Sequence, residues 1–293
     1  MAKNTNKSKK EIKPAFLHKR AKRKKKLGII GCGAIGREIA GAIDKGDIDV
    51  NFYGCHDLKK ENFNVLAGKL KNIRKPRFFD TNTELIKKCD LIVECASKDS
   101  VKEIFEKIIK FEKDVMFLSV GGVLANMDLF EEAKEKMIDV YIPSGAVIGL
   151  DGLEAAKYKG LKKVTLVTRK PPAGFKGVKY LKDRNIDVDS IKTETVVFDG
   201  NARDAVEDFP ANINVAATLS IAGIGAKDTN VKIIIDPFTR VNIHEIIVEG
   251  EFGRFKAITE NMPSPNNPKT SYLTALSTIV MLKGIVEPIH IGT

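Results

Sequence analysis

The chain has 293 residues, of which 43% are hydrophobic, enough to bury one large core or two of ordinary size. Its formal net charge of +11 would suggest a nucleic-acid or membrane partner, but residues 1–26 hold twelve bases and one acid, and the other 37 bases and 37 acids balance. Residues 27–293 therefore give no electrostatic sign of such a partner. No apolar stretch of 18 residues predicts a membrane span.

Residues 1–26 form a basic tail that we expect to be disordered. It ends in an unbroken run of bases from Lys22 to Lys26, and like charges repel one another while offering little apolar surface to bury. The tail also lacks the apolar run that a secretory signal needs. We expect a solvated extension, with non-specific contact to nucleic acid as the alternative.

The four cysteines, Cys32, Cys55, Cys89 and Cys95, occur at strand-like positions in the first third of the chain. Their spacing matches no metal site, so we expect buried thiols and no bound metal. Nothing in the sequence indicates secretion, and we therefore expect a cytoplasmic protein.

Strands and helices alternate through the first half. The pattern predicts strands at Leu27–Ile30, Asp49–Gly54, Phe78–Phe79, Leu91–Cys95 and Val115–Val120, and helices at Arg37–Ile43, Thr83–Lys88 and Ser100–Phe111. Such alternation is typical of a doubly wound parallel sheet. We expect a Rossmann-type α/β domain at residues 27–148.

From about Asp151 longer strands predominate, with few helices between them, at Val164–Thr168, Thr193–Phe198, Val231–Asp236 and Asn242–Gly250. They predict an α+β domain with a mixed or antiparallel sheet at residues 149–267. One helix is expected on this sheet, over Pro210–Ala222 with Asp208 as its N-cap. The segment 262–267 should be an extended linker, and a last helix, from Pro268 to Lys283 within residues 268–293, should return to the first domain.

The segment Gly31-Cys32-Gly33-Ala34-Ile35-Gly36 follows the first strand directly and opens a helix. Glycines in this G-x-G-x-x-G spacing allow a tight turn, close approach of the backbone to a pyrophosphate, and tight packing of the helix on the strand. The N–H groups at the helix start, near Ala34 and Ile35, could then hold the phosphates. The segment therefore predicts a dinucleotide site.

An acid, Asp57, follows the second strand, where it could accept hydrogen bonds from the adenosine ribose. Its charge would repel a 2′-phosphate, which favours NAD, although Lys59 and Lys60 leave NADP open. Ala96 and Ser97 follow the next long strand, at an edge where ligands bind in such sheets, and their small side chains leave room for the nucleotide.

Four blocks further along the chain, Ser144–Asp151, Phe209–Ala217, Asn242–Ile246 and Glu260–Ser271, together resemble the L-aspartate dehydrogenase family in their order and composition. The resemblance covers residues 27–285. It implies oxidation of L-aspartate to iminoaspartate, which hydrolyses to oxaloacetate and ammonia, or the reverse reductive amination. It further implies a homodimer and a supply of iminoaspartate for NAD biosynthesis.

The same resemblance implies roles for single residues. His244 corresponds to the proposed acid/base, and Asn214 to an asparagine that contacts the nicotinamide end of the cofactor. A small residue of the first block also touches the cofactor, and either Ala146 or the bulkier Ile148 takes that place here. Independently, a group that titrates near neutral pH suits proton transfer at an amine, and His244 is the only histidine of the second domain.

Strand alternation puts His244 on one face of its strand together with Asn242, Ile246 and Val248, so that it faces either the apolar side or the cleft. On residues alone, a histidine on such a face is more often a structural core residue than a catalyst. A dicarboxylate substrate also requires positive charge or free N–H groups, for which Arg169, Lys170, Arg240 and Lys269 are candidates. We favour the predicted helix start at Asn267–Ser271, with Asn267, Lys269 and Thr270.

Two other functions compete with this interpretation. The chain could be another two-domain reductase of the dihydrodipicolinate reductase or homoserine dehydrogenase type, although the His-His and Lys-x-Asp-x-Pro-Ser-Gly-Thr pattern of the former is absent. An aldehyde dehydrogenase would need a catalytic cysteine, and none follows Cys95. Alternatively, the chain could be a non-catalytic NAD-binding sensor whose basic tail engages nucleic acid.

Overall fold

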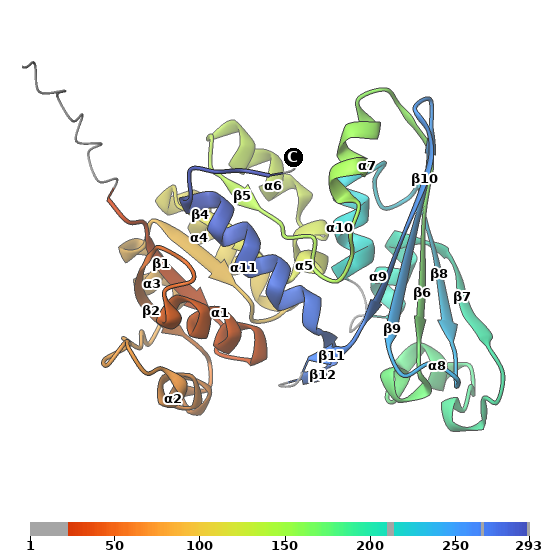
Figure 1. The fold of residues 1–293 in the computed structure, drawn as a ribbon, viewed down its shortest axis with the longest axis horizontal. Coiled ribbons are helices and arrows are strands. Elements are labelled where there is room, and N and C mark those ends of the chain that lie inside the picture. The colour runs from red at the N-terminus through yellow and green to blue at the C-terminus, as the bar shows by residue number, and fades with distance from the viewer. Residues whose placement is uncertain (1–22, 210–213, 265–266, 292–293) are drawn as a thin grey trace, which may run out of the picture.

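The computed structural model describes residues 23–209, 214–264 and 267–291, without the side chains of residues 267–270. Two five-stranded sheets lie beside each other, each with its own helices (Figure 1). Among the described residues, no helix is long and apolar enough to cross a membrane.

The first sheet is entirely parallel and has the strand order β2-β1-β3-β4-β5. Its strands are β1 (Lys26–Ile30), β2 (Asn51–His56), β3 (Leu91–Glu94), β4 (Asp114–Phe117) and β5 (Val140–Tyr141). The predicted strand at Phe78–Phe79 is reduced to a single bridge between Phe78 and Cys55. The expected Rossmann-type sheet is confirmed.

Helices cover both faces of this sheet. They are α1 (Ala34–Lys45), α2 (Lys60–Lys69), α3 (Asn82–Lys88), α4 (Val101–Phe111), α5 (Val120–Leu124) and α6 (Met127–Glu135), with a 3₁₀ turn at Lys98–Ser100. Side chains alternate along β1, so that Leu27 and Ile29 enter one core and Ile30 the other. The first core also receives Leu282 from α11 (Tyr272–Val286), which lies against α1 as expected of the last helix.

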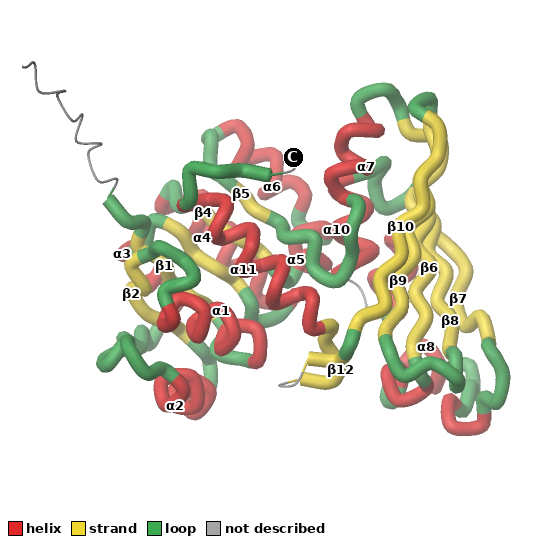
Figure 2. Tube along the Cα trace, viewed as in Figure 1, coloured by secondary structure: helices red, strands yellow, loops and turns green. Residues whose placement is uncertain are grey.

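The second sheet is mixed, with the order β10-β9-β6-β8-β7. Its strands are β6 (Leu161–Lys170), β7 (Thr195–Asn201), β8 (Thr229–Ile235), β9 (Asn242–Gly250) and β10 (Gly253–Asn261). The neighbours β6 and β8 pair in parallel, and the other neighbouring strands of this sheet pair antiparallel. One face is buried under helices, and the expected mixed sheet is confirmed (Figure 2).

The second half contains more helices than its sequence pattern predicts. The structure has α7 (Leu150–Lys157), α8 (Lys179–Asp183), α9 (Ala202–Asp208) and α10 (Asn214–Ala222), with 3₁₀ turns at Pro172–Phe175 and Val188–Ser190. Asp208 ends α9 and is therefore not the predicted N-cap of the next helix. The first residues of that predicted helix, 210–213, lie outside the described residues. Strand β10 was also missed.

The region before the last helix corrects another prediction. Residues Asn267–Ser271 form strand β12, which pairs with β11 (Pro263–Ser264), and the helix begins only at Tyr272. The substrate site that we predicted from helix-start N–H groups at Asn267–Ser271 is therefore wrong in its structural basis. The side chains of Asn267, Lys269 and Thr270 lie outside the described set.

The basic tail ends earlier than predicted. Lys26 is the first residue of β1, and the three bases before it are paired with acids of the first domain. Arg23 contacts Asp90 at 2.8 Å, Lys25 contacts Asp114 at 2.6 Å, and Lys24 pairs with Asp49. Residues 1–22 lie outside the described part of the chain.

Candidate functional site

The three glycines of the segment Gly31–Gly36 have different surroundings. Gly31 has a φ of +100°, and a Cβ there would lie 2.6 Å from the Cys95 carbonyl oxygen. A Cβ on Gly36 would lie 2.1 Å from the Gly31 oxygen, whereas a Cβ on Gly33 would meet nothing within 4 Å. The first and third glycines thus close the turn against β3 and α1. The second leaves open space beside the start of α1, where a pyrophosphate can approach the backbone.

Asp57 lies directly after β2 and ties that strand end to the glycine segment. Its Oδ2 accepts a hydrogen bond of 2.7 Å from the Cys32 N–H, and its Oδ1 accepts bonds from the Lys59 N–H and the Asn62 side chain. The half-buried carboxylate is therefore held at the edge where a ribose bound beside the glycines would lie. Such a carboxylate suits an NAD ribose, and the exposed Lys59 and Lys60 follow it closely.

Glu94, which our sequence analysis did not single out, is fully buried at the end of β3. Its carboxylate accepts hydrogen bonds from the Ala96 N–H at 2.8 Å and from both the N–H and the hydroxyl of Ser119. Burial raises the pKa of Glu94, and these hydrogen bonds oppose the rise. Glu94 thus fixes the loops after β3 and β4 at the ligand-binding edge of the sheet. The sequence feature that could have indicated Glu94 is the presence of an acid at the end of an otherwise apolar strand.

His244 lies on β9 and is 97% buried, on the same face as Asn242, Ile246 and Val248, so the predicted alternation is confirmed. Its Nδ1 shares a hydrogen bond of 3.1 Å with the Thr168 hydroxyl, from the neighbouring position on β6. Burial, and secondly the charge of Lys170, lower the pKa of His244 to about 3. The ring is therefore neutral at physiological pH, and Thr168 orients it.

The loop that carries Ala146 is held against this part of β9 and β10. The Ala146 carbonyl accepts hydrogen bonds from the Thr259 hydroxyl at 3.0 Å and from the Asn261 side chain at 2.8 Å, and Thr259 pairs with His244 in the sheet. Ala146 itself is buried, whereas Ile148 is half-exposed. The structure thus brings the Ala146 loop beside His244.

Asn214 begins α10 and reaches across to the first domain. Its Oδ1 accepts a hydrogen bond of 3.2 Å from the Gly121 N–H, at the start of α5 just beyond β4. Ser119, the partner of Glu94, lies two residues earlier. Asn214 is therefore joined to the same edge of the parallel sheet that holds the glycine segment and Ala96.

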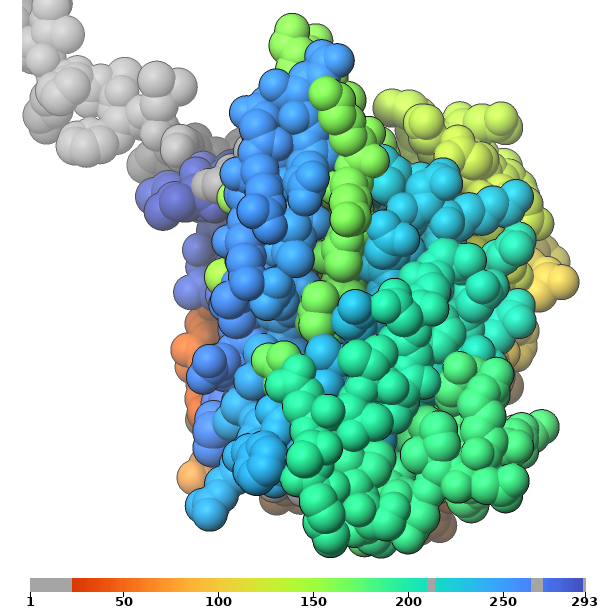
Figure 3. All heavy atoms as spheres, turned by 90° about the vertical axis from the view of Figure 1, so that its right-hand side faces the viewer, coloured from red at the N-terminus to blue at the C-terminus, as the bar shows by residue number. Residues whose placement is uncertain are grey.

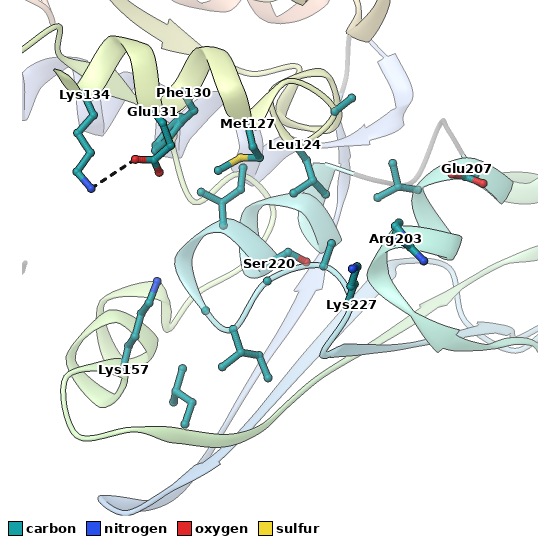
Figure 4. A pocket seen from close by; sticks show the side chains of 18 residues that line it. Leu124, Met127, Phe130, Glu131, Lys134, Lys157, Arg203, Glu207, Ser220 and Lys227 are labelled. Atoms are coloured by element: carbon teal, nitrogen blue, oxygen red, sulfur yellow. Dashed lines mark ion pairs between the residues drawn. The ribbon is translucent and has the colours of Figure 1, made fainter. Parts of the chain in front are cut away.

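A cavity of about 1030 Å³ lies between the two domains at the opposite end of α10 (Figure 4). It is bordered by the α5–α6 segment, by Arg203 of α9 and by Lys227 beyond α10. None of the described residues that line it belongs to the predicted site. The cavity is therefore distinct from the region around His244.

Comparison with known proteins agrees with these features. Residues 151–285 match the family model "Aspartate dehydrogenase, C-terminal", and residues 31–143 match "Homoserine dehydrogenase, NAD binding domain". The L-aspartate dehydrogenases of Methanococcoides burtonii and Methanosarcina acetivorans are 48% and 49% identical to this chain, each over 92% of it and 99% of the relative.

A solved structure, aspartate dehydrogenase from Thermotoga maritima, is similar with a TM-score of 0.71 at 27% identity, covering 92% of this chain and 99% of that one. The nucleotide-binding half matches a domain type that is named for homoserine dehydrogenases. This match accords with the homoserine dehydrogenase type as an alternative function in our sequence analysis. The catalytic half carries the distinguishing match.

Proposed function

Because this chain belongs to the L-aspartate dehydrogenase family, we propose that it oxidises L-aspartate to iminoaspartate with a nicotinamide cofactor, or runs the reverse reductive amination. Iminoaspartate hydrolyses to oxaloacetate and ammonia. The observation that carries the proposal is the buried, neutral His244, oriented by Thr168 beside the Ala146 loop. The same half of the chain gives the family match.

The residues at the edge of the first sheet suit the cofactor. The open space at Gly33 and the N–H groups of Ala34 and Ile35 would hold the pyrophosphate, and Asp57 the adenosine ribose. Gly31 and Gly36 shape the turn, and Ala96, Asn214 and either Ala146 or Ile148 would border the nicotinamide end. When bound, the cofactor supplies the acceptor for the substrate hydrogen at Cα. We favour NAD, and NADP remains an alternative because Lys59 and Lys60 lie next to Asp57.

His244 would take a proton from the substrate amine through Nε2, since Nδ1 is engaged with Thr168. A base with a pKa of about 3 would be weak, but negative charge brought by a dicarboxylate favours the imidazolium and raises that pKa. His244 would therefore gain basicity when aspartate is bound. Burial beside the apolar core excludes water from the imidazole and strengthens this effect.

The test is NADH formation with L-aspartate by the wild type and by His244→Ala. We expect turnover to fall roughly 10²–10⁴-fold in the variant, with NADH affinity changed less than about twofold, because His244 lies away from the phosphate site. Thr168→Val, which removes only the orienting hydroxyl, should show a smaller loss. If the wild type gives no aspartate-dependent NADH although it binds the cofactor, the proposed function fails. Unchanged turnover in His244→Ala would instead remove the acid/base role.

We also propose that the chain acts as a homodimer through the outer face of the second sheet. The strands β10, β9 and β6 present this face without a covering helix (Figure 3). The exposed Ile258 lies on it, as do the part-buried Ile243 and Ile247. Self-association would bury these side chains. Sedimentation should give twice the chain mass for the wild type and a shift toward the monomer for Ile258→Lys.

A cytoplasmic location and a supply of iminoaspartate for NAD biosynthesis remain part of this proposal. The catalytically silent sensor is the second candidate, and only the basic tail favours it. Cofactor and nucleic-acid binding by chains with and without residues 1–22 would separate the two.

A further inference from the structure

Lys170 is a buried cation on the same face of the second sheet as His244. It is the last residue of β6 and is only 6% exposed. Thr168, two residues earlier, pairs with His244 and is hydrogen-bonded to it. Because side chains two residues apart on a strand point to the same face, Lys170 lies one step further along the His244 face.

The structure does not place the other three candidate cations on the His244 face of the second sheet. Arg169 points to the opposite face, where it contacts Glu194 at 2.8 Å and lies 3.7 Å from Asp236. Arg240 is exposed beyond β8. The side chain of Lys269 lies outside the described residues. Of the four candidates, Lys170 is the one that the described structure places with His244.

The side chain of Lys170 is packed against the 3₁₀ turn Pro172–Phe175. Its aliphatic chain passes Gly174, where an added Cβ would lie 3.5 Å from the Lys170 Cβ and 3.6 Å from its Cδ. Its charge acts on the His244 ring, and its own pKa is lowered by burial to about 8. A buried ammonium group attracts a carboxylate bound beside it, because opposite charges interact strongly where water is excluded.

We propose that Lys170 binds the side-chain carboxylate of the substrate and so determines the preference for a dicarboxylic amino acid. This inference rests on the proposed function. The substrate Cα and its amine must lie at His244, and Lys170 is displaced from Thr168 by roughly 6–7 Å along the strand. That displacement suits the carboxylate that is further from Cα.

The charge of Lys170 predicts a distinct pH dependence. The cation binds the carboxylate, so kcat/KM for aspartate should fall as pH rises through the pKa of Lys170. Arginine keeps its charge throughout this range, so Lys170→Arg should retain part of the activity and lose the fall above pH 8. A purely structural lysine would not produce this difference between the two profiles.

The experiment compares the wild type, Lys170→Met and Lys170→Arg with L-aspartate as variable substrate. We expect Lys170→Met to raise KM for aspartate roughly 10–100-fold, the loss of one charge-assisted hydrogen bond, and to leave NADH affinity unchanged. The Ki of succinate should rise in parallel. The Ki of L-alanine, which has only the α-carboxylate, should not change.

An unchanged KM in Lys170→Met, with normal wild-type turnover of aspartate, would overturn this inference alone. Equal weakening of succinate and L-alanine would show that Lys170 contacts the α-carboxylate. Wild-type protein without aspartate turnover would instead refute the proposed function. If Lys170→Met did not fold, the Lys170→Arg pH profile would still decide the question.

Discussion

Gly33→Ala and Gly36→Ala should both weaken cofactor binding, but for different structural reasons. At Gly33 the backbone has φ −69° and ψ −163°, which alanine adopts without strain, and the new methyl group would meet no protein atom within 4 Å. The fold should therefore be as stable as the wild type. The methyl group would occupy the space in which we place the cofactor pyrophosphate.

At Gly36 the methyl group would lie 2.1 Å from the Gly31 carbonyl oxygen and 3.3 Å from the Cys95 sulfur. Because the first contact is with backbone, the turn between β1 and α1 must move. Overpacking of this kind costs about 1–3 kcal/mol, which lowers Tm by roughly 5–10 °C when the cost is near the upper end. Gly36→Ala should therefore lose stability and cofactor affinity together.

Thermal unfolding and NADH fluorescence titration measure the two effects. For Gly33→Ala we expect an unchanged Tm and a Kd for NADH raised about 10–100-fold, or about 1.4–2.7 kcal/mol. Gly41→Ala, in the same helix and also without atoms within 4 Å, is the control and should gain up to about 1 kcal/mol in stability with normal affinity. A large Tm loss in Gly33→Ala, or its normal affinity for NADH, would refute this division of roles.

Three further predictions concern buried charge. Glu94→Gln should lower the free energy of unfolding in urea by about 1–3 kcal/mol and weaken NADH binding, because the new amide cannot accept every hydrogen bond donated to that carboxylate. An unchanged free energy of unfolding together with unchanged NADH affinity would contradict this prediction. The pKa of His244 is about 3 in the folded chain against 6.5 ordinarily, so the unfolded chain takes up the proton first and stability falls between pH 6.5 and 3. From pH 6.5 to 5 the wild type should lose about 2 kcal/mol more than His244→Gln, and equal slopes would exclude this assignment. The pKa of Lys170 is about 8 in the folded chain against 10.5 ordinarily, so between pH 8 and 10.5 the unfolded chain holds the proton that the folded chain has lost, and the wild type should gain about 3 kcal/mol of stability relative to Lys170→Met; equal slopes in that range would speak against this assignment.

Local patterns predicted the elements whose structure depends on neighbouring residues. The apolar runs at Leu27–Ile30 and Leu91–Cys95 correspond to β1 and β3, whose ends differ from the prediction by one residue. A continuous apolar run predicts such a strand because both faces of a parallel sheet are buried. The alternation from Asn242 to Val248 placed His244 on the correct face. Each of these predictions needs only the period of the element.

Predictions failed where a distant or competing partner decides the backbone conformation. Pro268 followed by apolar residues is typical of a helix start. In the structure, however, Asn267–Ser271 pair antiparallel with Pro263–Ser264. Asp208 reads as an N-cap, but it completes the preceding helix α9. Periodicity does not distinguish a cap from the last turn of a neighbouring helix.

The sequence by itself determined the nucleotide-binding turn and the face of β9 on which His244 lies, because glycine spacing and strand period are local properties. The choice of His244 as acid/base came from the resemblance to the L-aspartate dehydrogenase family. Only the tertiary structure placed Thr168 beside His244 and Glu94 at the end of the parallel sheet that holds the glycine segment, and distinguished Lys170 from the other candidate cations. Their roles depend on register between β6 and β9 and on burial at the strand ends, since a hydroxyl, an ammonium group or a carboxylate has ordinary chemistry until the fold removes water and sets a partner beside it.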